Sequence, residues 1–251
     1  MTDEILATSK LSRRFGGVHA VRDVTLTVPR GQLRAIIGPN GAGKTTLFNL
    51  LTGQLPCHSG RIFFKGKDVT GLPPHYLCRH GLGRTFQINS IFGNATVLEN
   101  VQLALLAHQG KTWNLFASAK RLLVREAEEL FELLGLANQA GKLGSALAYG
   151  DRRRLEVALA LACQPELLLL DEPTSGMSLS EKPEMVKLIR NIAREQGVTA
   201  VLIEHDMDVV FSMADWITVM HQGTILADGT PREIQANHRV QEVYLGEDRH
   251  A

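Results

Sequence analysis

The sequence predicts an α/β protein with a mainly parallel sheet. Short apolar runs of strand length alternate with segments of helical periodicity, and one of these runs, Ala35-Ile36-Ile37, ends abruptly in a glycine-rich turn. Strands separated by helices usually pair in parallel, with helices covering both faces of the sheet. With 251 residues and 44% hydrophobic composition, the chain is long enough to bury a large core.

The strands are predicted from apolar, β-branched runs bounded by turn residues. In chain order they are Ile5–Phe15, Val24–Val28, Ala35–Ile37, Arg61–Phe64, Glu166–Leu170, Thr199–Ile203, Trp216–Met220 and Thr224–Ala227. A helix is predicted from Lys44 to about Leu55, directly after the glycine-rich turn.

Between about residues 92 and 163 the pattern changes to helices alone, at Val97–Ala107, Ala119–Leu134 and Asp151–Cys163. We therefore predict one domain over residues 1–251, in which residues 92–163 form an inserted helical subdomain. Residues 1–91 and 164–251 then form the α/β core. The stretch Gln109–Asn114 is the expected variable surface loop.

Composition limits the classes of partner and compartment. The 27 Lys and Arg residues are balanced by 26 Asp and Glu, so the net charge of +1 gives no reason to propose a nucleic-acid partner. Cys57, Cys78 and Cys163 are too widely spaced to suggest a disulfide framework or a structural zinc site, and a reducing cytoplasm is expected. No apolar run reaches the ~18 residues of a membrane span, so the chain is not expected to enter a bilayer by itself.

A phosphate-binding loop is the strongest local signal. Gly38, Pro39, Asn40, Gly41, Ala42, Gly43, Lys44 and Thr45 match the pattern G-x-x-x-x-G-K-[ST], between a predicted strand and a predicted helix. The glycines allow successive N–H groups to face inward, and the helix adds its positive end. Lys44 is predicted to reach the β- and γ-phosphates, and Thr45 to hold Mg²⁺. The alternative, a glycine-rich turn that merely joins a strand to a helix, leaves the lysine and the hydroxyl unexplained.

Two adjacent carboxylates end the predicted strand at Leu167–Leu170. Alternation along a strand points Asp171 and Glu172 to different sides, which permits different roles. Asp171 is placed to bind Mg²⁺ and Glu172 to polarise the water that attacks a γ-phosphate. Alternatively, the acids only cap the strand and open the turn at Pro173.

His205 follows another predicted strand, Thr199–Ile203. An imidazole at this point could hydrogen-bond the γ-phosphate or the attacking water. Taken alone, such a residue is more often a strand-end histidine with a structural partner, whereas the other motifs beside it favour a functional role.

In their order, these motifs resemble the ATP-binding-cassette family over essentially the whole chain. The resemblance implies a P-loop NTPase (RecA-like) core, an antiparallel β subdomain, the inserted helices, and ATP with Mg²⁺ as cofactors. It assigns Gln87 to the catalytic and metal-binding Q-loop, Thr46 to the phosphate site, and His205 to the switch histidine. Phe15 fits the aromatic residue that stacks on adenine, although a core phenylalanine at a strand end is the alternative.

The family signature L-S-G-G-Q is matched imperfectly by Leu147-Ala148-Tyr149-Gly150-Asp151. Ala148 lacks the serine hydroxyl, and Asp151 replaces glutamine. Backbone N–H groups near Gly150 are still expected to bind phosphate, and Asp151 suits the first turn of a helix. Because the family's signature binds the nucleotide of a second cassette, the resemblance implies a head-to-tail dimer of identical or similar chains.

Two neighbouring segments complete this part of the pattern. Ser175–Ser178 lies where the family has its D-loop, with Ser178 at a position that is often Asp. The arginines Arg152–Arg154 are expected to form a solvated helix face with no role in the site.

Further short motifs are similar to the ATPase subunits of branched-chain amino acid importers and of related systems for hydrophobic amino acids, amides and aromatic acids. They are Gly83–Gln87, Ile203–Met207 and Val243–Glu247. This resemblance implies transmembrane permease subunits as partners, with docking expected at Ile88–Val101. It also implies an indirect solute-binding protein and a place at the cytoplasmic face of the cell membrane.

Two other classes remain as alternatives. A soluble cassette protein of repair or translation usually has two cassettes or long coiled-coil insertions, and neither is visible. A small-molecule kinase shares the phosphate loop but leaves the signature, Glu172 and His205 unexplained.

Overall fold

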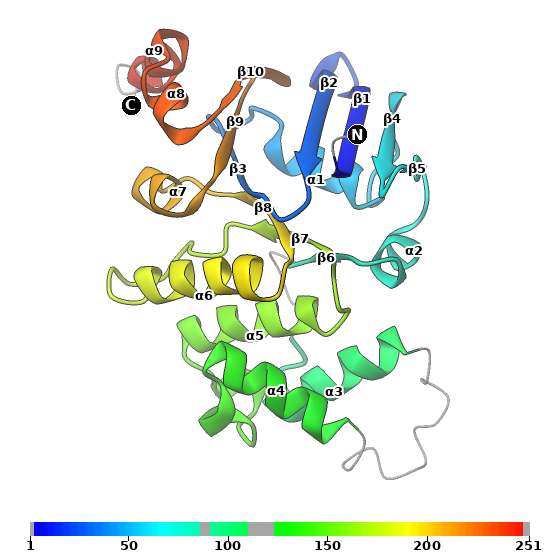
Figure 1. The fold of residues 1–251 in the computed structure, drawn as a ribbon, viewed down its shortest axis with the longest axis vertical. Helices are drawn as coiled ribbons and strands as arrows, with labels where there is room; N and C mark the ends of the chain where they lie inside the picture. Colours follow the sequence, from blue (N-terminus) through cyan, green and yellow to red (C-terminus); the bar gives the residue numbers. More distant parts are fainter. Residues whose placement is uncertain (1–2, 86–90, 110–122, 248–251) are drawn as a thin grey trace.

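The computed structural model describes residues 3–85, 91–109 and 123–247 (Figure 1). The strands are β1 (Glu4–Phe15), β2 (Val18–Pro29), β3 (Leu33–Ile37), β4 (Ser59–Phe64), β5 (Lys67–Asp68), β6 (Leu82–Arg84), β7 (Leu167–Asp171), β8 (Thr199–Ile203), β9 (Trp216–His221) and β10 (Thr224–Gly229). The α-helices are α1 (Lys44–Leu51), α2 (Pro74–Arg79), α3 (Val97–His108), α4 (Val124–Leu134), α5 (Tyr149–Leu161), α6 (Lys182–Glu195), α7 (Met207–Met213), α8 (Pro231–Gln235) and α9 (His238–Glu247).

The strands form two sheets. The central sheet has the order β10-β9-β3-β8-β7-β6, and all of its neighbouring strands are parallel except β9 and β10. A second sheet, β2-β1-β4-β5, is antiparallel. The predicted fold class, a mainly parallel core sheet with an antiparallel β part and inserted helices, is confirmed.

Alternation along the central strands separates two cores. On β3, Ile36 packs with Phe48 of α1 and with the antiparallel sheet. Its neighbours Ala35 and Ile37 pack on the opposite face, in the core that contains residues of α3 to α7. Since both faces are covered, each of β3, β7 and β8 has all five of its residues buried, as expected for central strands of a parallel sheet.

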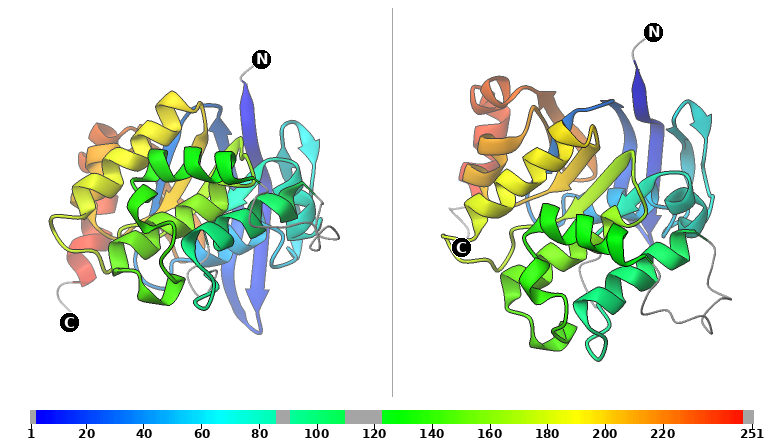
Figure 2. Two further views of the ribbon diagram at one scale, coloured as in Figure 1. Left: turned by 90° about the horizontal axis from the view of Figure 1, so that it is seen from below. Right: turned by 60° about the horizontal axis from the view of Figure 1, so that its bottom comes forward.

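The helices α3, α4 and α5 contact one another and lie together at one end of the molecule, away from β1 and β2 (Figures 1 and 2). Thr96 and Glu99 form a capping box that starts α3, and Gly135 in the left-handed region ends α4. The exact division of the domain at residues 92 and 163 stays a prediction. Within the described ranges, no helix combines the length and apolarity that a bilayer crossing needs.

Most predicted elements match the observed ones, with shifted ends. The first helix ends at Leu51, and α5 starts two residues earlier than predicted, at Tyr149. β2 begins at Val18 because it forms a long hairpin with β1, whose register shifts hide the alternation in the sequence. The start of the third predicted helix and most of the predicted loop at Gln109–Asn114 lie outside the described residues.

Candidate functional site

The site lies where three neighbouring parallel strands end. Ile36 of β3 pairs with Ile203 of β8, and Ile203 pairs with Asp171 of β7. The carboxyl ends of these strands are therefore level, and the loops that follow them meet at one edge of the sheet. These loops carry the glycine-rich sequence, the acid pair and His205.

The glycine-rich loop is shaped by backbone that other residues rarely adopt. Gly38, Gly41 and Gly43 have φ values of 149°, 79° and 101°. A Cβ at Gly38 would lie 2.1 Å from the carbonyl oxygen of Met220, and one at Gly43 would lie 2.1 Å from that of Ala20. These two glycines are therefore required by close backbone contacts with β9 and β2.

Lys44 starts α1 and folds back over the loop. Its Nζ donates hydrogen bonds to the carbonyl oxygens of Gly38 at 2.6 Å and Pro39 at 2.9 Å. The side chain thus lies across the hollow of the loop, and Thr45 is exposed beside it. An ammonium group beside a helix N-terminus makes this loop a place for an anion.

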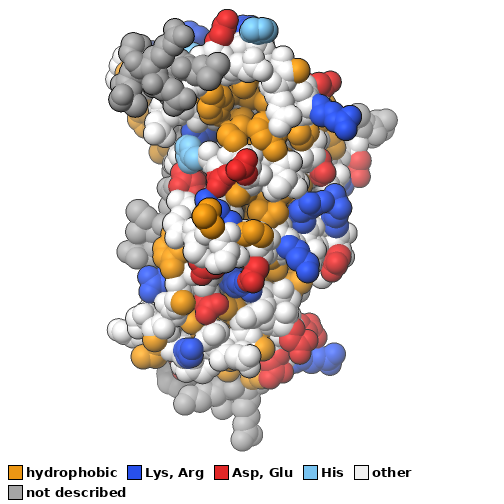
Figure 3. All heavy atoms as spheres, turned by 90° about the vertical axis from the view of Figure 1, so that its left-hand side faces the viewer, with side chains coloured by type: hydrophobic (Ala, Val, Ile, Leu, Met, Phe, Trp, Pro, Cys, Tyr) orange, Lys and Arg blue, Asp and Glu red, His pale blue; other side chains and the backbone are white. Residues whose placement is uncertain are grey.

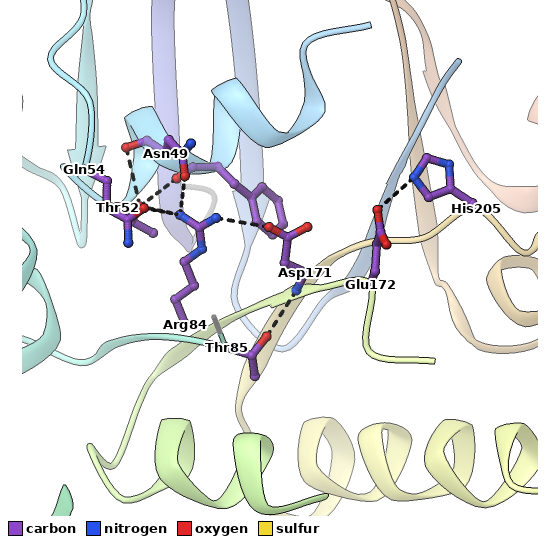
Figure 4. A network of polar contacts seen from close by, with 9 residues as sticks. Asn49, Thr52, Gln54, Arg84, Thr85, Asp171, Glu172 and His205 are labelled. Atoms are coloured by element: carbon purple, nitrogen blue, oxygen red, sulfur yellow. Dashed lines mark hydrogen bonds and ion pairs between the residues drawn. The ribbon is translucent and has the colours of Figure 1, made fainter. Parts of the chain in front are cut away.

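The two acids face different sides, as predicted, but strand alternation is not the cause. Asp171 is the buried last residue of β7, whereas Glu172 follows in the left-handed region with φ of 50°. Glu172 Oε1 lies 3.0 Å from His205 Nε2 (Figure 4). An ionised Glu172 can only accept, so this hydrogen bond requires a proton on His205 Nε2.

Asp171 faces the other way, toward Arg84 (Figure 4). Arg84 Nη2 donates to Asp171 Oδ2 at 3.1 Å, and the two side chains are only 7% and 1% exposed. The other terminal nitrogen of the guanidinium donates to three acceptors in or just after α1: Asn49 at 2.7 Å, Thr52 at 3.0 Å and Gln54 at 3.1 Å. Arg84 was given no role from the sequence, because a basic residue in a three-residue strand gives no signal of its own.

Burial dominates the electrostatics of this pair. It raises the pKa of Asp171 above the ordinary value, and the Arg84 interactions only partly offset that rise. It also lowers the pKa of the Arg84 guanidinium. Among the described residues, the buried Asp171 Oδ1 has no hydrogen-bond partner. A buried carboxylate oxygen without a donor fits a cation ligand, and this is the observation that favours a metal at Asp171.

A second buried carboxylate fixes the turn after the acid pair. Glu204, 3% exposed, accepts hydrogen bonds from the backbone N–H of Thr174 at 2.8 Å and from its hydroxyl at 2.7 Å. It thereby joins the segment after β7 to the end of β8. This contact holds Glu172 and His205 opposite each other. Glu204 was given no role from the sequence.

Comparison with known proteins decides the family. The model of the ABC transporter family matches residues 21–175, which is more than half of the chain. The chain belongs to the ATP-binding subunits of ABC transporters. It is therefore a nucleotide-binding ATPase. A second family model, described as branched-chain amino acid ATP-binding cassette transporter, matches residues 224–250.

Individual ABC proteins match over their whole length. BraF of Pseudomonas aeruginosa, a high-affinity branched-chain amino acid transport ATP-binding protein, is 42% identical over 98% of this chain and 100% of its own. LivG of Escherichia coli K12, which bears the same description, is 40% identical with the same coverage. A solved nucleotide-free cassette of an ABC transporter superposes with a TM-score of 0.86 at 30% identity, covering 96% of this chain and 98% of that one.

The segment that resembles the ABC signature opens α5. Ala148 is its N-cap, has extended backbone and makes no side-chain capping bond, while Asp151 lies in the first turn. Tyr149 Oη donates to the carbonyl oxygen of Ser175 at 2.9 Å, so the signature segment packs against the D-loop segment of the same cassette.

The expectation of a solvated arginine face in the cassette was wrong for two of its three members. Arg153 is half-buried, donates to Tyr149 Oη at 2.9 Å and pairs with Glu156 at 2.9 Å. Arg154 donates to the carbonyl oxygen of Leu134 at 3.1 Å and pairs with Glu184. The acceptors of Arg153 lie within α5 itself, at local helical spacing. Those of Arg154 come from α4 and α6, and a local pattern could not reveal them. Arg152 is exposed, as expected.

Two further predicted residues of the cassette have different outcomes. Phe15 is 47% exposed at the end of β1, with the Arg13 guanidinium 4.9 Å from its ring, so the alternative of a core phenylalanine is wrong. Gln87 lies outside the described residues.

Proposed function

We propose that this chain is the ATP-hydrolysing subunit of an importer for branched-chain amino acids. The observation that carries the proposal is the full-length likeness to BraF and LivG, both described as branched-chain amino acid transport ATP-binding proteins. The match at residues 224–250 supports the same solute class from a separate part of the chain.

ATP binding follows from the loop geometry. The phosphates occupy the hollow formed by residues 38–46, and Lys44 exchanges its bonds to the Gly38 and Pro39 carbonyl groups for the β- and γ-phosphate oxygens. The exposed ring of Phe15 is available for stacking on adenine.

Magnesium would be held by Asp171 and the Thr45 hydroxyl, with Gln87 as a further ligand. Within the described ranges, no cluster of three or more His, Cys, Asp or Glu side chains could hold a metal. This suits Mg²⁺, which is commonly bound by one or two protein groups together with phosphate oxygens and water. When bound, Mg²⁺ neutralises charge that develops on the transferred phosphoryl group.

Hydrolysis needs a base and an orienting donor. Glu172 is proposed to accept the proton of the attacking water, and His205 to turn its Nε2–H from Glu172 to the γ-phosphate. Their separation of 3.0 Å places both groups within reach of one water molecule. Asp171 faces the opposite way and does not compete for that role.

The complete site is proposed to need a second cassette, identical or similar. The first turn of α5 has no side-chain cap, so the N–H groups near Tyr149 and Gly150, with Ala148 and Asp151 beside them, are available for the γ-phosphate held by the partner. The hydrogen bond from Tyr149 to the Ser175 carbonyl oxygen then connects the signature segment, which serves one site, to the segment that follows the acid pair of the other site.

The permease subunits are proposed to dock at a largely apolar groove of about 440 Å³. Phe92, Asn100 and Leu103 line it, and Phe92 is 63% exposed. The first two belong to the expected docking region Ile88–Val101, of which residues 88–90 lie outside the described ranges. An exposed aromatic ring beside an apolar groove is typical of a protein interface.

Docking at permease subunits would place the chain at the cytoplasmic face of the cell membrane, indirectly coupled to a solute-binding protein. Charge gives no support for nucleic acid as a partner, since basic and acidic side chains are mixed on the surface in Figure 3.

The test is uptake of labelled leucine, isoleucine and valine by cells that lack the gene, complemented with the wild-type chain or with Glu172→Gln. Uptake should fall on deletion, return with the wild-type chain and stay low with the variant. Unchanged uptake of all three solutes after deletion would contradict the proposed solute class. Restored uptake with Glu172→Gln would contradict the role of Glu172.

A further inference from the structure

Two cysteines that are 85 residues apart in the sequence meet in the fold. Cys78 lies in α2, and Cys163 follows the end of α5. Their Sγ atoms are 2.9 Å apart, and both side chains are half-buried rather than sealed in the core. A disulfide bond measures about 2.05 Å, so the two sulfurs are in direct contact and less than about 1 Å from bonding distance.

The surroundings make the two thiols unequal. The hydrogen bond between Cys78 and Cys163, together with attraction to the Arg79 cation, lowers the pKa of Cys78 to about 7. The same hydrogen bond and burial raise the pKa of Cys163, which therefore stays a thiol. Both sulfurs line the apolar groove, where Arg84 and Glu156 are the other charged groups. A small neutral oxidant can reach them through that groove.

We propose that Cys78 and Cys163 form a dithiol site that peroxide oxidises to a disulfide. The Cys78 thiolate attacks one oxygen of the peroxide, the O–O bond breaks, and Cys78 becomes a sulfenic acid. The other oxygen leaves as hydroxide and becomes water by taking up a proton equal to the one that Cys78 released on ionising. The sulfur of Cys163 then attacks the Cys78 sulfur, the S–S bond forms, and the sulfenic hydroxyl leaves as water with the Cys163 proton. In total, two thiols and one hydrogen peroxide give one disulfide and two waters.

The bond would join α2 to the end of α5 and so fix one wall of the groove. α2 leads into β6, and Cys163 leads into β7, which pairs with β6. α3 also lines the groove, with Leu103 and Ala104. Given the proposed docking of permease subunits at this groove, oxidation would oppose any widening that the partner requires.

The third cysteine supplies a matched control. Cys57 is also half-buried, but its sulfur contacts the carbonyl oxygen of Gly60 at 3.9 Å and no other cysteine. All three thiols therefore meet the same oxidant, and only Cys78 and Cys163 have a resolving partner.

The experiment treats the purified chain with hydrogen peroxide, alkylates the remaining thiols and maps the peptides by mass spectrometry. The three alkylated cysteines should fall to one, Cys57, with a Cys78–Cys163 cross-linked peptide that dithiothreitol removes. Cys57→Ser should keep the cross-link, and Cys78→Ser and Cys163→Ser should lose it. Three alkylated cysteines after oxidation, or over-oxidised Cys78 without a cross-link, would overturn the proposal.

A second readout separates this inference from the proposed function. Co-purification of the oxidised chain with its permease subunits is compared with that of the reduced chain and of the Cys163→Ser variant treated identically. A cross-link that forms while co-purification is unchanged leaves the dithiol site in place and contradicts docking at this groove.

Discussion

At the residue scale, the buried pair of Arg84 and Asp171 determines how the acid after β7 is presented. A guanidinium held by three acceptors at the end of α1 keeps one carboxylate oxygen occupied and leaves Oδ1 without a donor among the described residues. Because burial works against both charges, the pair contributes little net stability by itself. Its effect is to orient Asp171.

Removing one member of the pair should be costly. We expect Arg84→Ala to lower the free energy of unfolding by about 3–5 kcal/mol, because it leaves Asp171 buried without a counter-charge. Urea unfolding monitored by circular dichroism measures the change. The double variant Arg84→Ala/Asp171→Asn should recover part of the loss, since the orphaned charge is then absent.

Arg30→Ala is the matched control, because it removes an arginine from two partly exposed ion pairs and should cost about 0.2–1 kcal/mol for each pair. An Arg84→Ala variant as stable as Arg30→Ala would show that the buried pair does not hold Asp171.

The site residues that could be predicted were those that belong to short local sequence patterns with a known chemical reason. The glycines before Lys44, the two acids after an apolar strand and the strand-end His205 are local patterns. Arg84 could not be found in this way, because its partner Asp171 is 87 residues away and the contact depends on the pairing of β6 with β7.

At the element scale, a cluster of charges joins the two sheets. Glu166, just before β7, pairs with Arg30 from the turn after β2 at 2.8 Å and with Lys65 from the turn after β4. These cations hold the pKa of Glu166 below its usual value of 4.5. The antiparallel sheet is therefore tied to the central sheet by one partly exposed carboxylate.

Stability should depend on pH through this carboxylate. A lowered folded-state pKa means that the stabilisation is fully present above the unfolded pKa and is lost as the pH falls through the folded one. Glu166→Gln should therefore cost about 0.2–1 kcal/mol for each exposed pair at pH 7, and the difference from wild type should shrink below pH 4.5. Thermal unfolding across this pH range measures it.

Glu195→Gln, at an exposed position at the end of α6, is the control and should show no such trend. A Glu166→Gln cost that persists unchanged in acid would contradict the ionic origin of the contact.

The central strands with continuous apolar patterns were predicted, whereas the short elements β5, β6 and α2 were not. The longer helix α6 was expected only as one of the helices that separate the strands, without bounds of its own. β3, β7 and β8 are uninterrupted apolar runs, whereas β6 has three residues and α2 has six. The strand order, with β8 between β3 and β7, depends on packing between distant segments and left no local signal. The same reason hid the contact of Cys78 with Cys163.

At the scale of the whole molecule, one chain is proposed to carry parts of two different sites. The phosphate loop and acid pair lie at the carboxyl ends of β3 and β7. The signature segment opens α5, which belongs to the core on the face of the central sheet opposite α1. The proposed mechanism requires these parts to meet across two chains with ATP between them.

The most direct measurement is light scattering of purified Glu172→Gln protein with Mg²⁺, with and without ATP. Loss of the base should slow hydrolysis by about 10²–10⁴-fold, so that bound ATP persists. We predict a mass of one chain without ATP and of two chains with it, and of one chain throughout when Lys44→Ala is added. A single-chain mass with ATP bound would contradict the sandwiched dimer and the role of the signature segment.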